Sequence, residues 1–194
     1  MYEPYHVSRY FDKRRRRSRS DNRKKRVKYW ANRRAARTVK KLPKLSLAVH
    51  AASHLILAAK ATTGLAIDHP QFGPLLQRAA ARMSLDLVVA DAGFDSESNH
   101  RLAREELKIR SLIPATIGRP GTRPPSGRYR RLMRQRLKMQ CDLKRYRQRW
   151  QVETVNSMIK RNLGSACRSR GACGRKRDLL MRAVTHNLMI IANL

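Results

Sequence analysis

Acidic residues are scarce in this chain, which holds 13 Asp and Glu against 45 Lys and Arg, for a formal net charge of +32. A balance this basic indicates a polyanionic partner, of which nucleic acid is the first choice. An acidic membrane surface fits less well, because the basic runs lack the interleaved large apolar residues of membrane-binding helices.

The charge is also uneven along the chain. Residues 1–41 contain 17 basic and 3 acidic side chains, residues 42–118 contain 8 and 7, and residues 119–194 contain 20 and 3. Like charges at the density of residues 1–41 repel, so we expect this segment to be disordered without a partner. The rest, residues 42–194, is predicted to form one folded domain.

The sequence also lacks closely spaced cysteine pairs, uninterrupted long apolar runs and the pattern of a secretory leader. Three cysteines without a C-x2-C pair argue against a disulfide scaffold and a structural zinc site. The longest apolar region, residues 45–67, is interrupted by His50, His54 and Lys60, so no membrane span is expected. The start, Met1 to Pro4, has no secretory leader pattern, which predicts a cytoplasmic location, at the bacterial nucleoid.

Apolar runs and helical stripes alternate through the central part of the chain, which predicts an α/β sheet. Asp68 is expected to cap the first helix, and Gly164 to end a long helical stretch that is interrupted near residues 139–141. The predicted strands are 45–49, 54–61, 85–90 and 109–113, and the predicted helices are 68–83, 96–107, 129–163 and 176–194, with a Pro- and Gly-rich loop at 118–127.

The stretch from Tyr146 to Lys160 has the spacing Y-x2-R-x3-E-x6-K, formed by Tyr146, Arg149, Glu153 and Lys160. On a helix these four side chains fall within an arc of about 60°. One carboxylate among cations and a phenol suits a phosphodiester site, since the acid can hold a metal ion and the cations can hold phosphates. The alternative is a solvated basic helix face. Trp150 lies between motif positions, and we expect it to pack in the core.

Asp91 follows the apolar run 85–90 and opens a glycine-containing turn. Functional groups gather beyond the carboxyl ends of strands in open α/β sheets, so Asp91 is a candidate metal ligand. With Glu153 it would supply two carboxylates, which is what Mg²⁺ takes from many proteins. The alternative is that Asp91 only caps the turn. Asp95 is interpreted as a turn residue.

Several blocks of this sequence together resemble the bacterial insertion-sequence DDE transposases, and most closely the group named for its Y-R-E-K motif. Matching separated blocks in order makes chance agreement improbable. The blocks are Tyr5–Phe11, Asp91–Ser96, Arg110–Pro114, Gly127–Arg131, Tyr146–Lys160 and Thr185–Met189.

The resemblance implies a ribonuclease-H-like mixed sheet flanked by helices and a catalytic domain over residues 42–194. It implies DNA cleavage and strand transfer with two divalent ions, Mg²⁺ or Mn²⁺. Asp91 would be the second acid of the catalytic triad and Glu153 the third, both metal-binding. Tyr146, Arg149 and Lys160 would contact phosphates of the transposon end. The implied partners are DNA, at transposon ends and targets, and a second copy in a homodimer.

The family's first catalytic Asp would precede Tyr5, and Asp12, Asp21 and Asp68 are not convincing substitutes. We therefore expect a truncated domain that lacks part of its first core strand, is inactive or impaired in cleavage, and still binds DNA. Two alternatives stay open. One is a non-catalytic, basic nucleic-acid-binding protein, and the other is an inhibitor that pairs with intact transposase.

Overall fold

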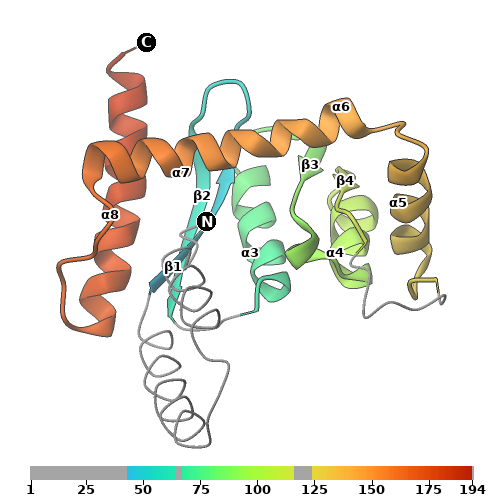
Figure 1. Ribbon diagram of the computed structural model, residues 1–194, viewed down its shortest axis with the longest axis horizontal. Helices are drawn as coiled ribbons and strands as arrows, with labels where there is room; N and C mark the ends of the chain where they lie inside the picture. The colour runs from blue at the N-terminus through green and yellow to red at the C-terminus, as the bar shows by residue number, and fades with distance from the viewer. Residues whose placement is uncertain (1–42, 64–66, 116–123, 194) are drawn as a thin grey trace, which may run out of the picture.

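The computed structural model describes residues 43–63, 67–115 and 124–193 and shows a mixed α/β fold (Figure 1). The basic segment 1–41 and the run Tyr5–Phe11 lie outside the described residues. The elements are β1 (Pro43–Val49), β2 (Ile56–Thr63), α3 (His69–Ala80), β3 (Leu87–Val89), η1 (Ala92–Phe94), α4 (Glu97–Arg101), η2 (Leu102–Glu106), β4 (Arg110–Leu112), α5 (Arg128–Lys138), α6 (Leu143–Tyr146), η3 (Arg147–Arg149), α7 (Trp150–Leu163) and α8 (Ala172–Ile191).

The four predicted strands are all present, and they form two separate pairs. β1 pairs antiparallel with β2, with Leu45 opposite Ala61. β3 pairs in parallel with β4, with Val88 opposite Ser111. Within the described residues β1 and β3 each pair along one edge only, and no ladder joins the two pairs.

Helix α3 packs on the strands through an apolar stripe of the kind the sequence predicts. Phe72, Leu75, Leu76 and Ala79 are all buried. Phe72 and Leu76 join Ile113 in one core cluster, whereas Leu75 and Ala79 pack with Ala58 of β2 in another. One helix thus contributes to the core beneath both strand pairs, which places α3 between them.

Helices α7 and α8 cover the hairpin formed by β1 and β2. Ile56 of β2 forms a core cluster with Val155 and Ile159 of α7 and Ala183 of α8. Figure 1 shows α7 running across the molecule from α8 past the strands towards α5. Because α7 crosses this way, it carries its side chains from one strand pair towards the other.

The C-terminal helices follow the predicted pattern, except that α8 begins earlier than predicted. The interruption lies between α5 and α6, where Gln140 has a φ of 58°, and Gly164 ends α7 with a φ of 86°. Helix α8 begins at Ala172, four residues before the predicted start at Lys176. The helix α4 continues into a π-helical turn, η2. No helix among the described residues is long and apolar enough to cross a membrane.

The predicted cap of α3 is wrong in its chemistry. Asp68 precedes the helix and Pro70 lies in the first turn, but the Asp68 side chain makes no capping hydrogen bond. It forms an ion pair with Lys44 of β1 instead. A nearby cation thus draws the carboxylate away from the helix end.

Candidate active site

Asp91 follows β3 after one intervening residue, Ala90, and the turn-cap interpretation of Asp91 is confirmed. Its Oδ1 accepts a hydrogen bond of 2.8 Å from the backbone N–H of Ala92 and so caps the short turn η1. Its Oδ2 lies 3.5 Å from Nη1 of Arg149. The cap fixes the carboxylate while one oxygen stays directed at the helix that carries the motif.

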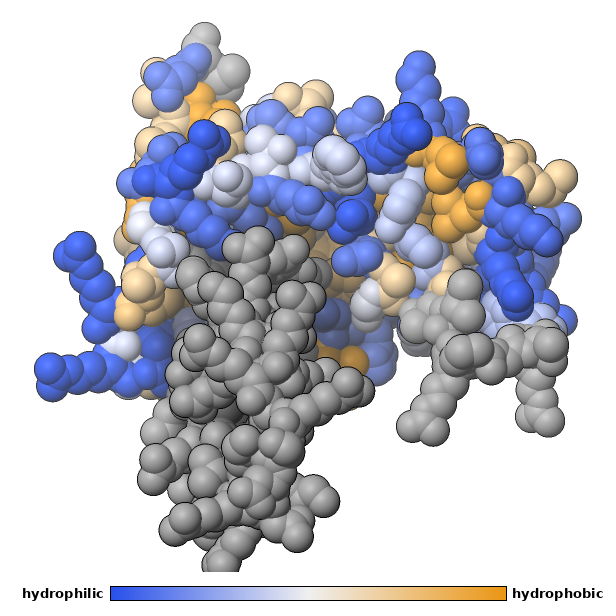
Figure 2. All heavy atoms as spheres, in the orientation of Figure 1, coloured by the Kyte–Doolittle hydropathy of each residue, from blue (hydrophilic) through white to orange (hydrophobic). Residues whose placement is uncertain are grey.

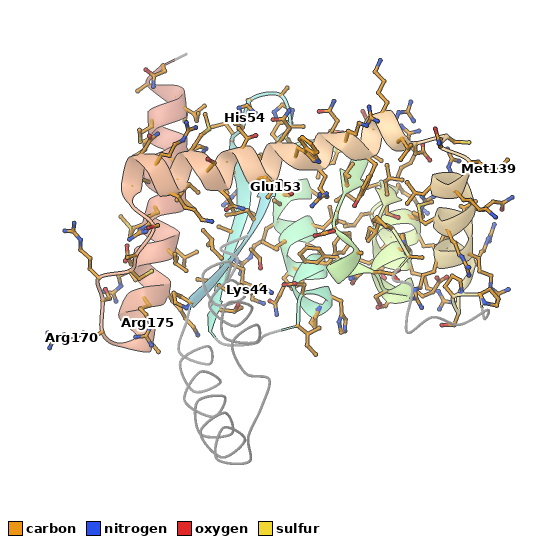
Figure 3. All side chains as sticks on the ribbon, viewed as in Figure 1. Lys44, His54, Met139, Glu153, Arg170 and Arg175 are labelled. Atoms are coloured by element: carbon orange, nitrogen blue, oxygen red, sulfur yellow. The ribbon has the colours of Figure 1, made fainter. Side chains whose placement is uncertain are left out.

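Arg149 links the two predicted catalytic acids. Its Nη1 lies 3.1 Å from Oε1 of Glu153 as well as 3.5 Å from Asp91. Glu153 lies in the first turn of α7, and Figure 3 labels it where this helix passes the strands. Two carboxylates that are 62 residues apart in sequence therefore share one guanidinium.

Tyr146 joins this cluster through its ring. The guanidinium carbon of Arg149 lies 5.8 Å from the centre of the Tyr146 ring, within the range of a cation–π contact. Burial raises the pKa of the Tyr146 phenol, Arg149 opposes the rise, and the charges of Asp91 and Glu153 add to it. The phenol is therefore neutral at physiological pH and remains a hydrogen-bond donor.

The cluster opens on a cavity of about 680 Å³ between the two strand pairs. Asp91, Arg149, Glu153 and Lys160 all line it, so four of the five predicted site residues meet at one place. The floor is apolar, because Phe72, Leu75 and Leu76 of α3 line it too. The other lining residues are Ser46, Leu47, Ala48, Val89, Ala90, Phe94, Val152, Asn156 and Ser157.

Asn156 is a cavity residue that the sequence analysis missed. It lies one helical turn from both Glu153 and Lys160, about 20° outside the arc of the motif. Its side chain is buried, with 7 % of the residue exposed, and its Oδ1 has no hydrogen-bond partner among the described residues. Leaving a buried polar group unpaired costs about 1–3 kcal/mol. Its position three residues after Glu153 and four before Lys160 was the signal in the sequence that could have identified it as a site residue.

The residues at the cavity fit a divalent ion in their chemistry. One or two carboxylates are the usual protein contribution to a Mg²⁺ site, which is completed by water and substrate phosphate. Asp91 and Glu153 supply two, and the Asn156 amide oxygen is unpaired. The described residues contain no group of three or more His, Cys, Asp or Glu side chains that could hold a metal ion.

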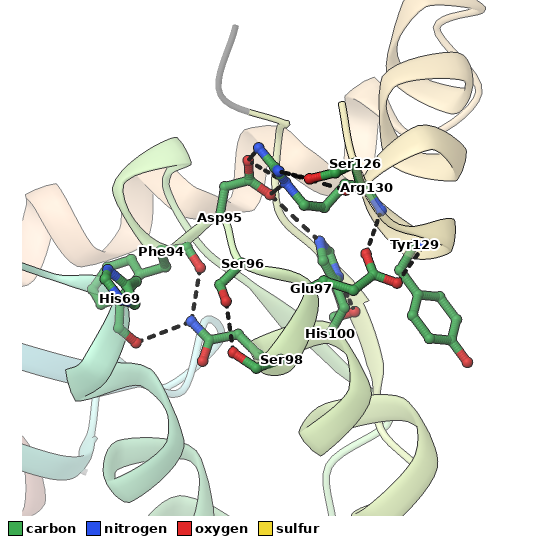
Figure 4. Close-up of polar contacts among 12 residues, drawn as sticks. His69, Phe94, Asp95, Ser96, Glu97, Ser98, His100, Ser126, Tyr129 and Arg130 are labelled. Carbon is green, nitrogen blue, oxygen red and sulfur yellow. Dashed lines mark hydrogen bonds and ion pairs between the residues drawn. The ribbon is translucent and has the colours of Figure 1, made fainter. Parts of the chain in front are cut away.

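Asp95 belongs to a second polar cluster, away from the cavity (Figure 4). Its buried carboxylate receives hydrogen bonds of 2.9 Å from Nε and 2.7 Å from Nη2 of Arg130. The Nε2 of His100 lies 4.0 Å from Asp95, and its Nδ1 lies 2.7 Å from Oγ of Ser111. Burial lowers the pKa of His100. The negative charge of Asp95 opposes this effect, and the positive charges of Arg104 and Arg130 add to it, so the pKa is lowered overall.

Ser111, His100 and Asp95 have the composition of a hydrolytic triad, but their burial argues for a structural role. His100 and Ser111 are 0 % and 1 % exposed, so no substrate reaches the hydroxyl. Arg104 also donates a 2.8 Å hydrogen bond to that Oγ, so the hydroxyl is already engaged by two neighbours. The cluster joins α4, β4 and α5 around the turn that follows Asp91.

Two further motif regions have structural roles. Asn187 of α8 accepts a hydrogen bond of 2.8 Å from the backbone N–H of Ile56 and donates one of 2.9 Å to its carbonyl, so it holds β2. The expectation that Trp150 packs in the core is wrong, because it is 66 % exposed. It begins α7 on the side away from the packed stripe of Val155 and Ile159.

The family model for the transposase DDE domain matches residues 11–188. The chain belongs to this family. No curated protein and no solved structure matches it. The α/β class predicted from the resemblance agrees with the family and with the observed fold. The match places the cavity with Asp91 and Glu153 inside the region shared with transposase DDE domains, and the narrower Y-R-E-K group stays a prediction.

Proposed function

We propose that this DDE-domain chain binds DNA along α7 and holds a phosphodiester at the cavity, with impaired strand cleavage. The observation that carries the proposal is the convergence of Asp91, Arg149, Glu153 and Lys160 on one cavity. Figure 2 adds that the face crossed by α7 carries mostly hydrophilic side chains. A basic, hydrophilic face beside two carboxylates suits a nucleic-acid backbone.

In this proposal the cations receive the phosphates. Arg149 and Lys160 pair with phosphate oxygens, and the neutral Tyr146 phenol donates a hydrogen bond to one of them. When phosphate takes the guanidinium, Asp91 and Glu153 are released from Arg149. Those two carboxylates would then hold a divalent ion, Mg²⁺ or Mn²⁺. Such an ion would activate the attacking oxygen and stabilise the leaving oxygen.

Impaired cleavage is proposed because only two acids meet at the cavity among the described residues. The test is cleavage of labelled DNA carrying candidate transposon ends, in Mg²⁺ or Mn²⁺, by the full chain and by Glu153→Gln. We expect no cleavage above the variant's background. Cleavage by the full chain that disappears in Glu153→Gln would show an active enzyme and contradict the proposed impairment.

DNA binding is tested separately. The binding constant for a labelled duplex should fall steeply with salt, because each neutralised phosphate releases counterions. Affinity that does not change between low and physiological salt would contradict the proposal.

The second candidate function is a non-catalytic DNA binder or an inhibitor that pairs with intact transposase. It is favoured by the lack of a three-acid metal group among residues 43–63, 67–115 and 124–193. A pure binder needs no carboxylate at the cavity. Asp91→Asn should then leave Mn²⁺ binding unchanged, whereas our first proposal requires it to weaken.

A further inference from the structure

We propose that Asn156 is a further ligand residue of the cavity, and that its side-chain oxygen binds a divalent cation together with Asp91 and Glu153. The inference rests on the proposed function, because it concerns the same cavity. It adds a neutral oxygen donor that lies outside the Y-x2-R-x3-E-x6-K spacing.

The first observation is that Asn156 differs from Asn99, which is buried, and from Asn187, which is half-buried, because both of these side chains are hydrogen-bonded. Asn99 is equally buried, and its Nδ2 donates hydrogen bonds of 3.0 Å to the carbonyl of His69 and 2.8 Å to that of Phe94. Asn187 uses both ends of its amide on Ile56. The Oδ1 of Asn156 is buried without a partner. A polar atom in that state indicates a ligand or an ordered water.

The second observation is the position of Asn156 at the cavity. Asn156 lines the cavity, one turn along α7 from Glu153 and one turn before Lys160. Residues at such spacings are neighbours on a helix surface. Across the cavity stands Asp91, whose Oδ1 is held by the Ala92 backbone N–H. Side chains that carry oxygen donors, from two elements, therefore line the same cavity.

The third observation concerns chemistry. Hard divalent cations bind carboxylate and carbonyl oxygens, and an amide oxygen adds a donor without adding negative charge. That matters here because Arg149 and Lys160 line the same cavity. A site of two carboxylates and one amide would give Mg²⁺ or Mn²⁺ a third oxygen ligand without adding a negative charge that competes with phosphate for the cations.

The test measures Mn²⁺ binding to the full chain saturated with a short DNA duplex, by electron paramagnetic resonance and by calorimetry, after subtraction of the Mn²⁺ bound by the duplex alone. Asn156→Leu should weaken Mn²⁺ binding at least about tenfold, the scale of loss typical at metal sites. Asn156→Asp, which keeps the shape and adds a charge, should bind Mn²⁺ as tightly as the unaltered chain or more tightly. The matched control is Asn162→Leu, an exposed asparagine of the same helix, which should change nothing.

A melting curve without metal separates this role from a structural one. Asn156→Leu should melt no lower than the unaltered chain, because the leucine removes an unpaired buried amide. A clearly lower melting temperature for both Asn156→Leu and Asn156→Asp would show that Asn156 supports the fold, and would overturn the proposal.

Failure of this inference differs from failure of the proposed function. If Glu153→Gln weakens Mn²⁺ binding and Asn156→Leu binds as Asn162→Leu does, the ligand role of Asn156 is overturned and the two-carboxylate site stands. If Glu153→Gln and Asp91→Asn both leave Mn²⁺ binding unchanged, the metal site itself is wrong, and the inference falls with it.

Discussion

At the scale of single residues, Arg149 decides the charge of the cavity. It is the cation that stands between Asp91 and Glu153, at 3.5 and 3.1 Å. Both carboxylates are well exposed, at 44 % and 62 %, so these ion pairs are worth only about 0–1 kcal/mol to the fold. The arginine therefore matters more for binding than for stability.

Replacing Arg149 by alanine should weaken DNA binding about tenfold, the loss expected for a charge-assisted hydrogen bond, while the melting temperature changes little. Without it, the two carboxylates would also repel phosphate. Fluorescence anisotropy with a labelled duplex measures the loss at fixed salt.

The matched control for that experiment is Arg147→Ala, which removes the same charge two residues away at an exposed position. It should cost clearly less affinity, because it changes only the long-range field. Equal losses for the two variants would mean that Arg149 acts as bulk charge and has no particular place in DNA binding.

The motif residues could be predicted from the sequence because their spacing alone places them on one helix face. Asn156 lies beside that face, one helical turn from Glu153 and Lys160, and could have been found. The contact between Arg149 and Asp91 could not, because it depends on how η3 packs near the turn that follows β3. Trp150 was misjudged because size and apolarity favour burial, yet the helix buries Val155 and Ile159 instead.

At the scale of elements, the start of α5 depends on a carboxylate from another helix. Glu97 of α4 accepts hydrogen bonds of 3.1 Å from the backbone N–H of Tyr129 and 3.2 Å from that of Arg130. Burial alone would raise the pKa of Glu97, but backbone hydrogen bonds and the His100 charge lower it overall. Gly127 allows this approach, because a Cβ there would lie 2.2 Å from Oε2 of Glu97.

Gly127→Ala should therefore destabilise the fold by about 1–3 kcal/mol, since it adds a steric clash to a strained backbone. Gly127 has a φ of 96°. Urea unfolding measures the change.

The control is Gly164→Ala, which has a similar φ of 86° but open space around the added Cβ. It isolates the backbone effect and should cost less. If the two variants lose the same stability, the contact between Glu97 and the α5 terminus does not need a glycine.

Strands and helices were predictable where apolar runs or stripes are long, as in β1, β2 and α3. The π-helical turn η2 and the capping of α5 by Glu97 were not, because both depend on side chains that approach from other elements. The Asp68 cap failed for the same reason, since Lys44 lies on a strand that precedes it. Local chemistry predicts where a helix begins, whereas tertiary contacts decide which group satisfies its end.

At the scale of the whole molecule, self-repulsion is the dominant electrostatic effect. A formal net charge of +32 disfavours the compact state, and salt screens that repulsion. We expect the melting temperature of the DNA-free chain to rise between about 10 and 150 mM NaCl, as the Debye length shrinks from about 30 to 8 Å. Scanning calorimetry at several NaCl concentrations measures it.

The opposite outcome is equally informative. Salt also weakens ion pairs such as Arg136–Asp142, which are 2.5 Å apart, and Arg182–Asp178, which are 3.0 Å apart. A melting temperature that falls with NaCl would mean that these contacts outweigh the net repulsion. An equal concentration of an uncharged osmolyte serves as the control for effects unrelated to charge.

The separation of the strands into two pairs has a mechanical consequence. The cavity lies between the two strand pairs. One wall is formed by β1 and the other by β3 and Asp91, and both α3 and α7 also line the cavity. Within the described residues, no backbone hydrogen-bond ladder joins the two walls. A ligand or ion bound by Asp91 on one wall and by Glu153 on the crossing helix would therefore link the two strand pairs. The relative mobility of the two pairs would then depend on whether the site is occupied.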